Sequence, residues 1–484
     1  MSVLIIFDYL CNIYKLHYRQ DMNSLNHRNI VPLLGTLALA CPAANKEKPN
    51  IIIIYTDDMG ISDIGCYGGI FTPTPNIDRI GNDGIRFTQY YTACPISSPS
   101  RVGMTTGMYP TKWGITNYLD TRKMNRERKS NDYLSAEAPA IARSFQKAGY
   151  ATAHIGKWHM GGGRDVTDMP QISEFGFDKS LSTWESPSPD PAITASNWIW
   201  SDQDSIKRWE RTRYFVDNVL GFLKENKGRP CYIHLWPDDM HTPYVPSKEE
   251  YDKGKKMWNA KVNFIPVLAE YDRQIGRLLD GIAALGLKDN TIIVFTSDNG
   301  PAPSYKNART AGLRGQKGTL YEGGIRMPFL VCWPARIKGG KVNSTTVITA
   351  LDLFPTLCKL AGIEPQTNGY QLDGTDISDV LLGKTARKRN VPMFWEFGQQ
   401  FVGKAKPQNA YQFRSPNIAV RDGKWKLLVN YDGTDAELYN IENDEKETTN
   451  LAATHPSVTS RLKQMAIEWY NASFRKHAGQ LRND

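Results

Sequence analysis

Five short runs of mostly apolar, β-branched residues limit most strongly how this chain can fold. They are "NIIIIY", "YATAHI", "PCYIHLW", "NTIIVFTS" and "MPFLVCW", at residues 50–55, 150–155, 230–236, 290–297 and 327–333. Runs of this kind are typical of strands buried on both faces of a parallel sheet. Apolar residues at helical spacing occupy residues 138–149 and 264–286 between the runs. The pattern predicts an α/β fold whose large mixed, mostly parallel sheet is flanked by helices.

The pattern of apolar and polar residues changes after about residue 388. "NIAVRDGKWKLLVNYDG" and "AELYNI" alternate apolar and polar residues around turn residues, which is typical of antiparallel hairpins. Residues 456–475 follow with a helical pattern. We therefore expect a main domain at residues 46–388 and a smaller C-terminal α+β subdomain with an antiparallel sheet at residues 389–484.

The N-terminal residues have the features of an export signal. From Met22 a basic start leads into the apolar residues 30–40, which end in the small-residue sequence Ala-Leu-Ala. That run is too short to span a bilayer, so the mature chain is expected to lack a transmembrane segment. We interpret residues 1–41 as a leader, with residues 1–21 as an upstream extension rather than a first apolar anchor. Export to a periplasm or cell surface follows, and Cys41 is a candidate lipoprotein cysteine.

The net charge of the chain indicates which class of binding partner it suits. The chain has 59 Lys and Arg against 50 Asp and Glu, a net charge of +9, which suits an anionic partner such as an acidic polysaccharide. No run of five or six basic residues is present, so a nucleic-acid tail is not indicated.

Two of the seven cysteines lie in the leader, and the other five have no zinc-finger spacing. A disulfide-built scaffold is therefore not expected.

Polar, titratable residues follow four of the predicted strands directly. The segments are Thr56-Asp57-Asp58, Gly156-Lys157-Trp158-His159, Pro237-Asp238-Asp239-Met240-His241 and Asp298-Asn299-Gly300. Ligands of open α/β sheets bind outside the carboxyl ends of the strands. Each segment alone is ordinarily a turn or a helix cap, but their coincidence at strand ends predicts one shared site.

The residue types in these segments indicate the chemistry of that site. Asp57, Asp58, Asp298 and Asn299 offer hard oxygen ligands without a cysteine, a set that suits Ca²⁺ or Mg²⁺. Positive charge is available from Lys157, Lys317, Arg101 and the histidines. Cations around a metal ion suit a tetrahedral anion, sulfate or phosphate, whose charge grows on the leaving oxygen during transfer.

At this point the sequence resembles the sulfatases of the alkaline-phosphatase-like superfamily over about residues 48–470. Their defining stretch is Cys or Ser, any residue, Pro-Ser-Arg, three residues and a segment ending in Thr-Gly, and residues 97–107 read "SSPSRVGMTTG". Companion motifs occur in the same order as in the family: "TPNID", "GKWH", "HTP", "SDNG", "GQKGTLYEGGIRMP", "LDLFPTL", "AVRDGKWKL" and "ELYNIENDEKETTNLA". The resemblance implies that residues 46–388 are the catalytic domain.

The register of the defining stretch decides between the candidate nucleophiles. Proline must lie two residues after the nucleophile, serine three and arginine four, and Ser97 meets this with Pro99, Ser100 and Arg101. Cys94 has Ile96 at the proline position and fails, although a thiol is more reactive. We therefore expect Cys94 to be a packing residue.

The resemblance implies that Ser97 is oxidised after synthesis to formylglycine (3-oxoalanine) by a serine-oxidising maturation enzyme. An unmodified serine is a weak nucleophile and would be left as a stable sulfate ester. A hydrated aldehyde offers one hydroxyl to attack sulfur, and the other loses a proton so that collapse to the aldehyde expels sulfate.

The resemblance also implies roles for the remaining site residues. One Ca²⁺ ion is expected on Asp57, Asp58, Asp298, Asn299 and the modified Ser97. Arg101 and His159 are expected to steady the hydrate, with His159 as the candidate base. Lys157 and Lys317 are expected to hold sulfate oxygens. The proton for the leaving oxygen comes from His241 or Lys317.

The substrate class is inferred from export, positive charge and a Pro/Ser-rich loop at residues 186–203. These features favour a sulfated sugar, and the sequence around "HIGKWHMGGGRDV" is similar to sulfatases acting on galactose or N-acetylgalactosamine units. The candidate sugar contacts are Arg164, Asp165, Asp238, Asp239, Trp395 and Glu396.

Two other interpretations use the same residues. A phosphatase or phosphodiesterase of the superfamily could use Ser97 unmodified, although those relatives bring extra His and Asp ligands for two zinc ions. The chain could also be an inactive binder of sulfated glycans if Ser97 is never oxidised.

Overall fold

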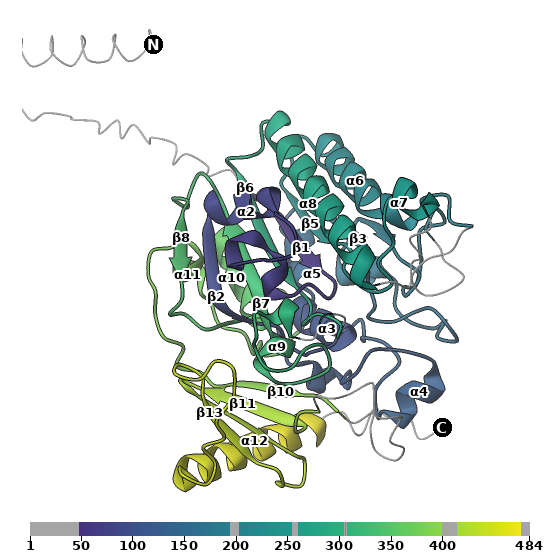
Figure 1. Cartoon of the computed structure of the whole chain (residues 1–484). Coiled ribbons are helices and arrows are strands. Elements are labelled where there is room, and N and C mark those ends of the chain that lie inside the picture. The colour runs from purple at the N-terminus through teal and green to yellow at the C-terminus, as the bar shows by residue number, and fades with distance from the viewer. Residues whose placement is uncertain are drawn as a thin grey trace, which may run out of the picture. The chain divides into compact units, whose positions relative to one another are not determined.

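All five predicted strands form in the computed structural model, and they belong to one sheet that has nine strands in the described part of the chain (Figure 1). They are β1 (Asn50–Thr56), β3 (Ala151–Gly156), β5 (Cys231–Trp236), β6 (Thr291–Ser297) and β7 (Arg326–Cys332). The other strands are β2 (Ile85–Tyr91), β4 (Lys179–Ser182), β8 (Lys341–Asn343) and β9 (Ile348–Thr349). The order across the sheet is β4-β3-β5-β1-β6-β7-β2-β8, and β9 also pairs with β2.

The structure describes residues 48–193, 203–253, 260–303, 305, 307–398 and 414–475. The predicted leader at residues 1–41, with Met22 and Cys41, lies outside the described residues, as does part of the loop predicted at 186–203. The described residues belong to one compact unit, and the domain boundary at residue 388 stays a prediction. None of the described helices is long and apolar enough to cross a bilayer.

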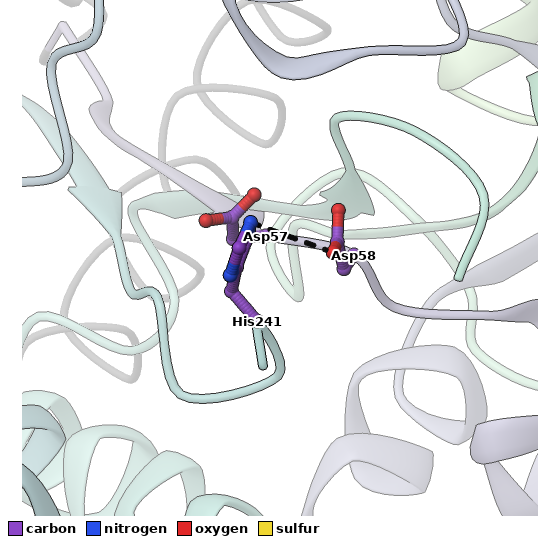
Figure 2. A group of neighbouring side chains, drawn as sticks. All are labelled: Asp57, Asp58 and His241. Atoms are coloured by element: carbon purple, nitrogen blue, oxygen red, sulfur yellow. Dashed lines mark ion pairs between the residues drawn. The ribbon is translucent and has the colours of Figure 1, made fainter. Parts of the chain in front are cut away.

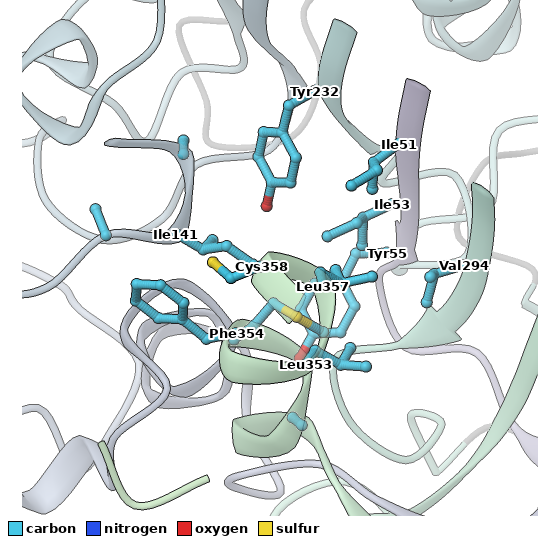
Figure 3. Packing of buried hydrophobic residues seen from close by; sticks show 14 of the residues in the cluster. Ile51, Ile53, Tyr55, Ile141, Tyr232, Val294, Leu353, Phe354, Leu357 and Cys358 are labelled. Atoms are coloured by element: carbon cyan, nitrogen blue, oxygen red, sulfur yellow. The ribbon is translucent and has the colours of Figure 1, made fainter. Parts of the chain in front are cut away.

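Strand β1 lies inside the sheet and pairs in parallel with β5 on one side and β6 on the other. All seven of its residues are buried, which explains why it reads as a continuous apolar run. Ile51, Ile53 and Tyr55 enter the core on one face, where they pack with a later helix (Figure 3), and Ile52 and Ile54 enter the core on the other face. The two-residue period of the strand thus divides its side chains between two cores.

Strand β7 differs from the other predicted strands in direction. It is antiparallel to both of its neighbours, β6 and β2, whereas the other pairs in the sheet are parallel. A parallel successor to β6 would need a crossover helix, and the described residues between β6 and β7 form only a 3-10 turn and the four-residue helix Glu322–Ile325. The connection at residues 298–325 consequently stays at the carboxyl edge of β6, where the polar strand ends lie.

Helices cover both faces of the sheet. α5 (Ile141–Lys147) and α10 (Leu353–Ala361) contribute to the core that contains Ile51, Ile53 and Tyr55. The opposite core receives α2 (Pro75–Asn82), α6 (Arg211–Glu225) and α8 (Ala260–Ala284), of which α6 and α8 lie side by side (Figure 1). The helices predicted at residues 138–149 and 264–286 are confirmed with shifted ends.

A second sheet is antiparallel, as the C-terminal sequence pattern predicts. It has the order β10 (Met393–Glu396), β11 (Ile418–Asp422), β12 (Trp425–Val429) and β13 (Glu437–Asn440). The predicted helix at residues 456–475 forms as α12 (Pro456–Arg475), and Leu462 and Ala466 pack on one face of this sheet. The mixed α/β fold with an antiparallel C-terminal sheet is therefore confirmed.

A buried cluster of charges joins this second sheet to α9 (Glu322–Ile325), which precedes β7. The Nζ atom of Lys426 lies 2.9 Å from Glu322 Oε1 and 2.8 Å from Glu447 Oε1. Glu447 Oε2 accepts a hydrogen bond from the backbone N–H of Glu322 at 2.7 Å. Burial alone raises the pKa of Glu322, but the positive charges of Lys426, Arg326 and Arg421 together outweigh it and lower the pKa to about 2. Lys426 is therefore the cation that Glu322 and Glu447 share at this junction.

Replacing that lysine tests the junction. Lys426→Met leaves two buried carboxylates without their shared cation, so we expect the free energy of unfolding to fall by about 3–5 kcal/mol. Guanidinium denaturation followed by circular dichroism measures the change. The control is Lys424→Met, an exposed residue of the same hairpin, which should change stability by less than about 0.5 kcal/mol. Equal, small effects of both substitutions would contradict the assignment.

Candidate active site

The parallel pairing of β1 and β6 brings two polar strand ends together. Thr56 is in register with Ser297, so Asp57 and Asp58 emerge beside Asp298 and Asn299. The backbone N–H of Asp58 donates to Asp298 Oδ1 at 3.1 Å, and Asn299 Nδ2 donates to Asp58 Oδ1 at 2.7 Å. Asp58 has a φ of 59°, a left-handed conformation that turns the chain sharply at the end of the strand. All four side chains are buried.

Ser97 begins the buried helix α3 (Ser97–Thr106) and faces this group of carboxylates. Its Oγ donates to Asp57 Oδ1 at 3.1 Å and to Asn299 Oδ1 at 3.3 Å as alternative acceptors. The neighbouring candidates have other contacts. Ser98 Oγ accepts the backbone N–H of Leu119 at 3.0 Å, and Ser100 Oγ lies 2.7 Å from Tyr55 Oη.

Cys94 lies away from the carboxylates. Its side chain is buried in a core with Trp395 and Phe397, and its Sγ lies 3.6 Å from the carbonyl oxygen of Glu396. Burial, followed by the negative charge of Glu396, raises the pKa of the thiol well above its ordinary value. A thiol in this environment is protonated and unreactive at neutral pH.

Three cations contact the carboxylates. Lys157 Nζ lies 2.8 Å from Asp57 Oδ2, and Arg101 Nη2 lies 2.7 Å from Asp298 Oδ2. Lys317 Nζ reaches both oxygens of Asp58, at 2.7 and 2.8 Å. Lys317 comes from the connection between β6 and β7, which the antiparallel return of β7 keeps at this edge.

The charges in the group set the pKa values of its members. Burial alone raises the pKa of Asp57, but the positive charges of Lys157, Arg101 and Lys317 hold it well below its usual range. Burial and the charge of Asp57 raise the pKa of Asp298 to about 7. One more cation among these carboxylates would favour the ionised form of Asp298.

His241 also lies beside the carboxylates (Figure 2). Its Nε2 lies 3.8 Å from Asp58 Oδ2 and 3.1 Å from Lys317 Nζ, and its Nδ1 lies 2.6 Å from the carbonyl oxygen of Thr242. The carbonyl is an acceptor, so Nδ1 carries the proton and Nε2 accepts from the lysine. Burial, then the charge of Lys317, lowers the pKa of His241 to about 4.

His159 is held by a residue that the sequence motifs do not reveal. His159 Nε2 lies 3.2 Å from Glu185 Oε2 and 3.4 Å from the carbonyl oxygen of Leu119. Glu185 Oε1 accepts from Arg164 Nη1 at 2.8 Å, and Arg164 Nε lies 2.9 Å from Asp120 Oδ1. Burial, followed by the charge of Lys157, lowers the pKa of His159 well below its ordinary value.

Glu185 and Asp120 could not be found from their sequence context. Glu185 follows β4 closely, so the strand-end rule applies to it, but β4 reads "KSLS" and has no apolar run that would mark a strand. Asp120 lies in an irregular segment after α3 without a recognisable motif. Only contacts between distant segments identify the two carboxylates.

A pocket of about 340 Å³ opens over Ser97. It brings together six predicted site residues from separate parts of the chain: Ser97, Lys157, His159, Arg164, His241 and Lys317. The rest of the described lining consists of Ile96, Tyr118, Asp120 and Glu185. Its volume is in the lower part of the range of ligand pockets.

The other candidate sugar contacts are not among the described lining residues of this pocket. Asp238 forms ion pairs with Arg208 at 2.5 Å and Arg211 at 2.8 Å, and Asp239 accepts from Thr212. Asp165 accepts the backbone N–H of Arg122 at 3.0 Å.

Trp395 and Glu396 lie in the second sheet. Trp395 Nε1 donates to the carbonyl oxygen of Thr92 at 2.8 Å, and Glu396 accepts from Tyr431. Burial raises the pKa of Glu396 to about 8. Contacts of either residue with a sugar stay a prediction.

The donor atoms around Ser97 fit a hard divalent cation. Carboxylate oxygens of three aspartates, the amide oxygen of Asn299 and the hydroxyl of Ser97 converge without a sulfur ligand. Ligand atoms of Asp57, Asp58 and His241 lie within 4.8 Å of one another. Calcium takes six to eight oxygen ligands in flexible geometry, so an oxygen-rich group of this kind suits it better than zinc.

Comparisons with known proteins agree with this geometry. A family model described as "Sulfatase" matches residues 49–363, and one described as "N-sulphoglucosamine sulphohydrolase, C-terminal" matches residues 315–471. An N-acetylgalactosamine-6-O-sulfatase of Bacteroides thetaiotaomicron is 26% identical over 520 residues, covering 91% of this chain and 98% of the relative. Arylsulfatase A of Homo sapiens is 29% identical over 481 residues, covering 89% of each chain.

Solved structures show the same fold. Ps i-CgsB in complex with k-i-k-neocarrahexaose is 28% identical with a TM-score of 0.71, covering 88% of this chain and 93% of that one. A phosphonate monoester hydrolase of Agrobacterium radiobacter, 19% identical, has a TM-score of 0.63 over 88% of this chain and 96% of its own. The fold is thus alkaline-phosphatase-like. With the family model matched over residues 49–363, this chain belongs to the sulfatase family and is a sulfuric ester hydrolase.

Proposed function

We propose that this enzyme removes sulfate from a sulfated sugar, with a formylglycine made from Ser97 as the nucleophile and one calcium ion beside it. The observation that carries the proposal is the place of Ser97. Its register matches the sulfatase motif, and its Oγ lies 3.1 Å from Asp57 Oδ1 at the floor of the pocket. Once oxidised and hydrated, residue 97 supplies the oxygen that accepts the sulfuryl group. A serine-oxidising maturation enzyme is the partner that this chemistry requires.

Calcium would be held by the oxygens of Asp57, Asp58, Asp298, Asn299 and residue 97. When bound, it supplies positive charge that balances the carboxylates and polarises a sulfate oxygen. Lys157 and Lys317 line the same pocket as Ser97, and in the proposal their ammonium groups hold the remaining sulfate oxygens. Arg101 is fully buried, and its positive charge balances that of Asp298 at 2.7 Å.

The two histidines take opposite proton-transfer roles in this proposal. Both groups near His159 Nε2 are acceptors, so that nitrogen carries the proton and Nδ1 keeps its lone pair. A neutral His159 with a free lone pair suits the base that deprotonates the hydrated residue 97. His241 Nε2 accepts from Lys317, so these two residues together suit delivery of a proton to the leaving oxygen.

A galactose or N-acetylgalactosamine unit is the proposed sugar. Support comes from the relative whose name is N-acetylgalactosamine-6-O-sulfatase, which this chain covers over 98% of its length. The pocket volume of about 340 Å³ suits one sugar ring. The predicted leader places the enzyme in a periplasm or at a cell surface, where such glycans are accessible.

Substitution of Ser97 tests the nucleophile. Ser97→Ala should lower kcat by about 10³-fold or more, because the acceptor oxygen is lost. Cys94→Ala, the matched control three residues away, should keep most of the activity. Mass spectrometry of the peptide spanning Ser97 should show the loss of two hydrogen atoms. An unmodified peptide in a protein that releases phosphate but no sulfate would support a phosphatase instead.

Removal of calcium tests the metal. The ion binds the folded protein, so addition of calcium at about 100 times its Kd should stabilise the fold by about 2.7 kcal/mol, and EDTA should reverse the gain. Differential scanning calorimetry measures the shift. Asp58→Asn should reduce the calcium-dependent part of it, whereas Asp280→Asn, at an exposed ion pair with Arg79, should not. A shift of equal size in both variants argues against this site.

Substrates with different leaving groups test the proposed proton delivery by His241. A sugar alkoxide needs a proton as it leaves and nitrophenolate does not, so the two substrates separate acid catalysis from binding. His241→Ala should lower kcat/KM by about 10²-fold for a sugar sulfate and by less than about tenfold for 4-nitrophenyl sulfate. Equal losses on both substrates would rule out the proton-delivery role.

A further inference from the structure

We propose that Asp120, Arg164 and Glu185 form a recognition wall for the hydroxyl groups of a sugar ring that carries no second anionic group. The inference rests on the proposed function, because it concerns the same pocket, and it adds the charge class of the substrate. The wall is defined here as these three residues. Asp120 and Glu185 belong to no motif of the sequence.

The wall is rigid because one arginine is held from two sides. Arg164 Nε lies 2.9 Å from Asp120 Oδ1, and Arg164 Nη1 lies 2.8 Å from Glu185 Oε1. The guanidinium carbon lies 5.1 Å from the ring centroid of Trp184, a cation–π contact. Side chains fixed in this way lose little conformational entropy when they bind a ligand, so they are suited to recognising the positions of hydroxyl groups on a sugar.

Charges in the pocket are distributed unevenly. Among the described lining residues the cations are Lys157, Lys317 and Arg164, and the carboxylates are Asp120 and Glu185. Both carboxylates pair with Arg164, whereas the two lysines pair with the aspartates beside Ser97. A single anionic group is therefore attracted to the Ser97 end. At the wall, the positive charge of Arg164 is already balanced.

The surroundings of the wall supply no further unbalanced cation among the described residues in contact with it. Arg128 Nη2 lies 3.5 Å from Asp120 Oδ2 and donates to Tyr118 Oη at 2.7 Å, with its guanidinium carbon 4.0 Å from the centroid of the Tyr118 ring. His159 contacts Glu185, and its lowered pKa keeps it neutral. The two arginines thus face two carboxylates, and the cluster as a whole has no net charge.

The consequence is discrimination by charge. A hydroxyl group can donate to Asp120 or Glu185 and accept from Arg164, so a neutral sugar finds partners on the wall. A second sulfate or a carboxylate would lose hydration at the wall without gaining an unbalanced cation, because Asp120 and Glu185 already pair with Arg164. The enzyme should therefore prefer a singly sulfated neutral sugar.

The test compares substrates that differ in one sulfate. The active, calcium-loaded enzyme is assayed on N-acetylgalactosamine 6-sulfate, N-acetylgalactosamine 4,6-disulfate and 4-nitrophenyl sulfate. We expect kcat/KM for the monosulfated sugar to exceed that for the disulfated sugar by about tenfold or more. The nitrophenyl ester serves as a probe that offers no sugar hydroxyls to the wall.

A substitution in the wall tests whether the wall causes the preference for the monosulfated sugar. Asp120→Asn keeps the shape and an acceptor oxygen but removes one negative charge. The ratio of kcat/KM for the monosulfated sugar to kcat/KM for the disulfated sugar should shrink by about tenfold. Asp280→Asn, an exposed carboxylate of α8, should leave all three values unchanged.

Three outcomes separate this inference from the proposed function. Hydrolysis of 4-nitrophenyl sulfate together with equal or greater activity on the disulfated sugar would overturn the inference and leave the sulfatase mechanism standing. An unchanged preference in Asp120→Asn would also overturn it. Failure of the modified, calcium-loaded enzyme on all three sulfate esters would overturn the proposed function, and the inference with it.

Discussion

The parallel register between β1 and β6 is the constraint on which the active site depends. It sets Thr56 beside Ser297, and the next residues of both strands are acidic or amide side chains. Three aspartates are thereby buried close together, a placement that carries a large cost unless cations lie beside them. Lys157, Lys317 and Arg101 meet this need from three different segments. The site is consequently anionic at its floor and cationic around it, as the proposed calcium-assisted sulfate transfer requires.

The direction of β7 extends the same constraint to the rest of the molecule. Because β7 returns antiparallel, the connection that bears Lys317 stays at the edge where the carboxylates lie. That connection ends in α9, whose Glu322 is bound by Lys426 of the second sheet. The C-terminal sheet thus supports the segment that supplies an active-site lysine. The C-terminal sheet therefore holds the connection that bears Lys317, and it also buries its own apolar face.

Much of the fold and the floor of the site could be predicted from sequence because both depend on local patterns. Continuous apolar runs mark strands buried on two faces, and the residues directly after them mark the binding edge. Register within one short motif singled out Ser97 over Cys94, and the structure places Ser97 beside Asp57 and Cys94 in a core. This rule does not mark strand β2, since its sequence "IRFTQYY" mixes polar and apolar residues. The direction of β7 depends on its partners and has no local signal.

The sequence by itself determined five strands of the main sheet, the polar residues at four of their ends, the oxygen-rich side chains there and the register that favours Ser97 as the nucleophile. These properties follow from residue type and spacing along the chain, so they can be read without a structure. Only the tertiary structure decided which distant side chains meet: Glu185 with His159 and Arg164, Asp120 with Arg164, and Lys317 with His241. Such pairs depend on how loops from separate strands converge at one edge. That convergence is a property of the packed sheet, and no spacing within a single segment encodes it.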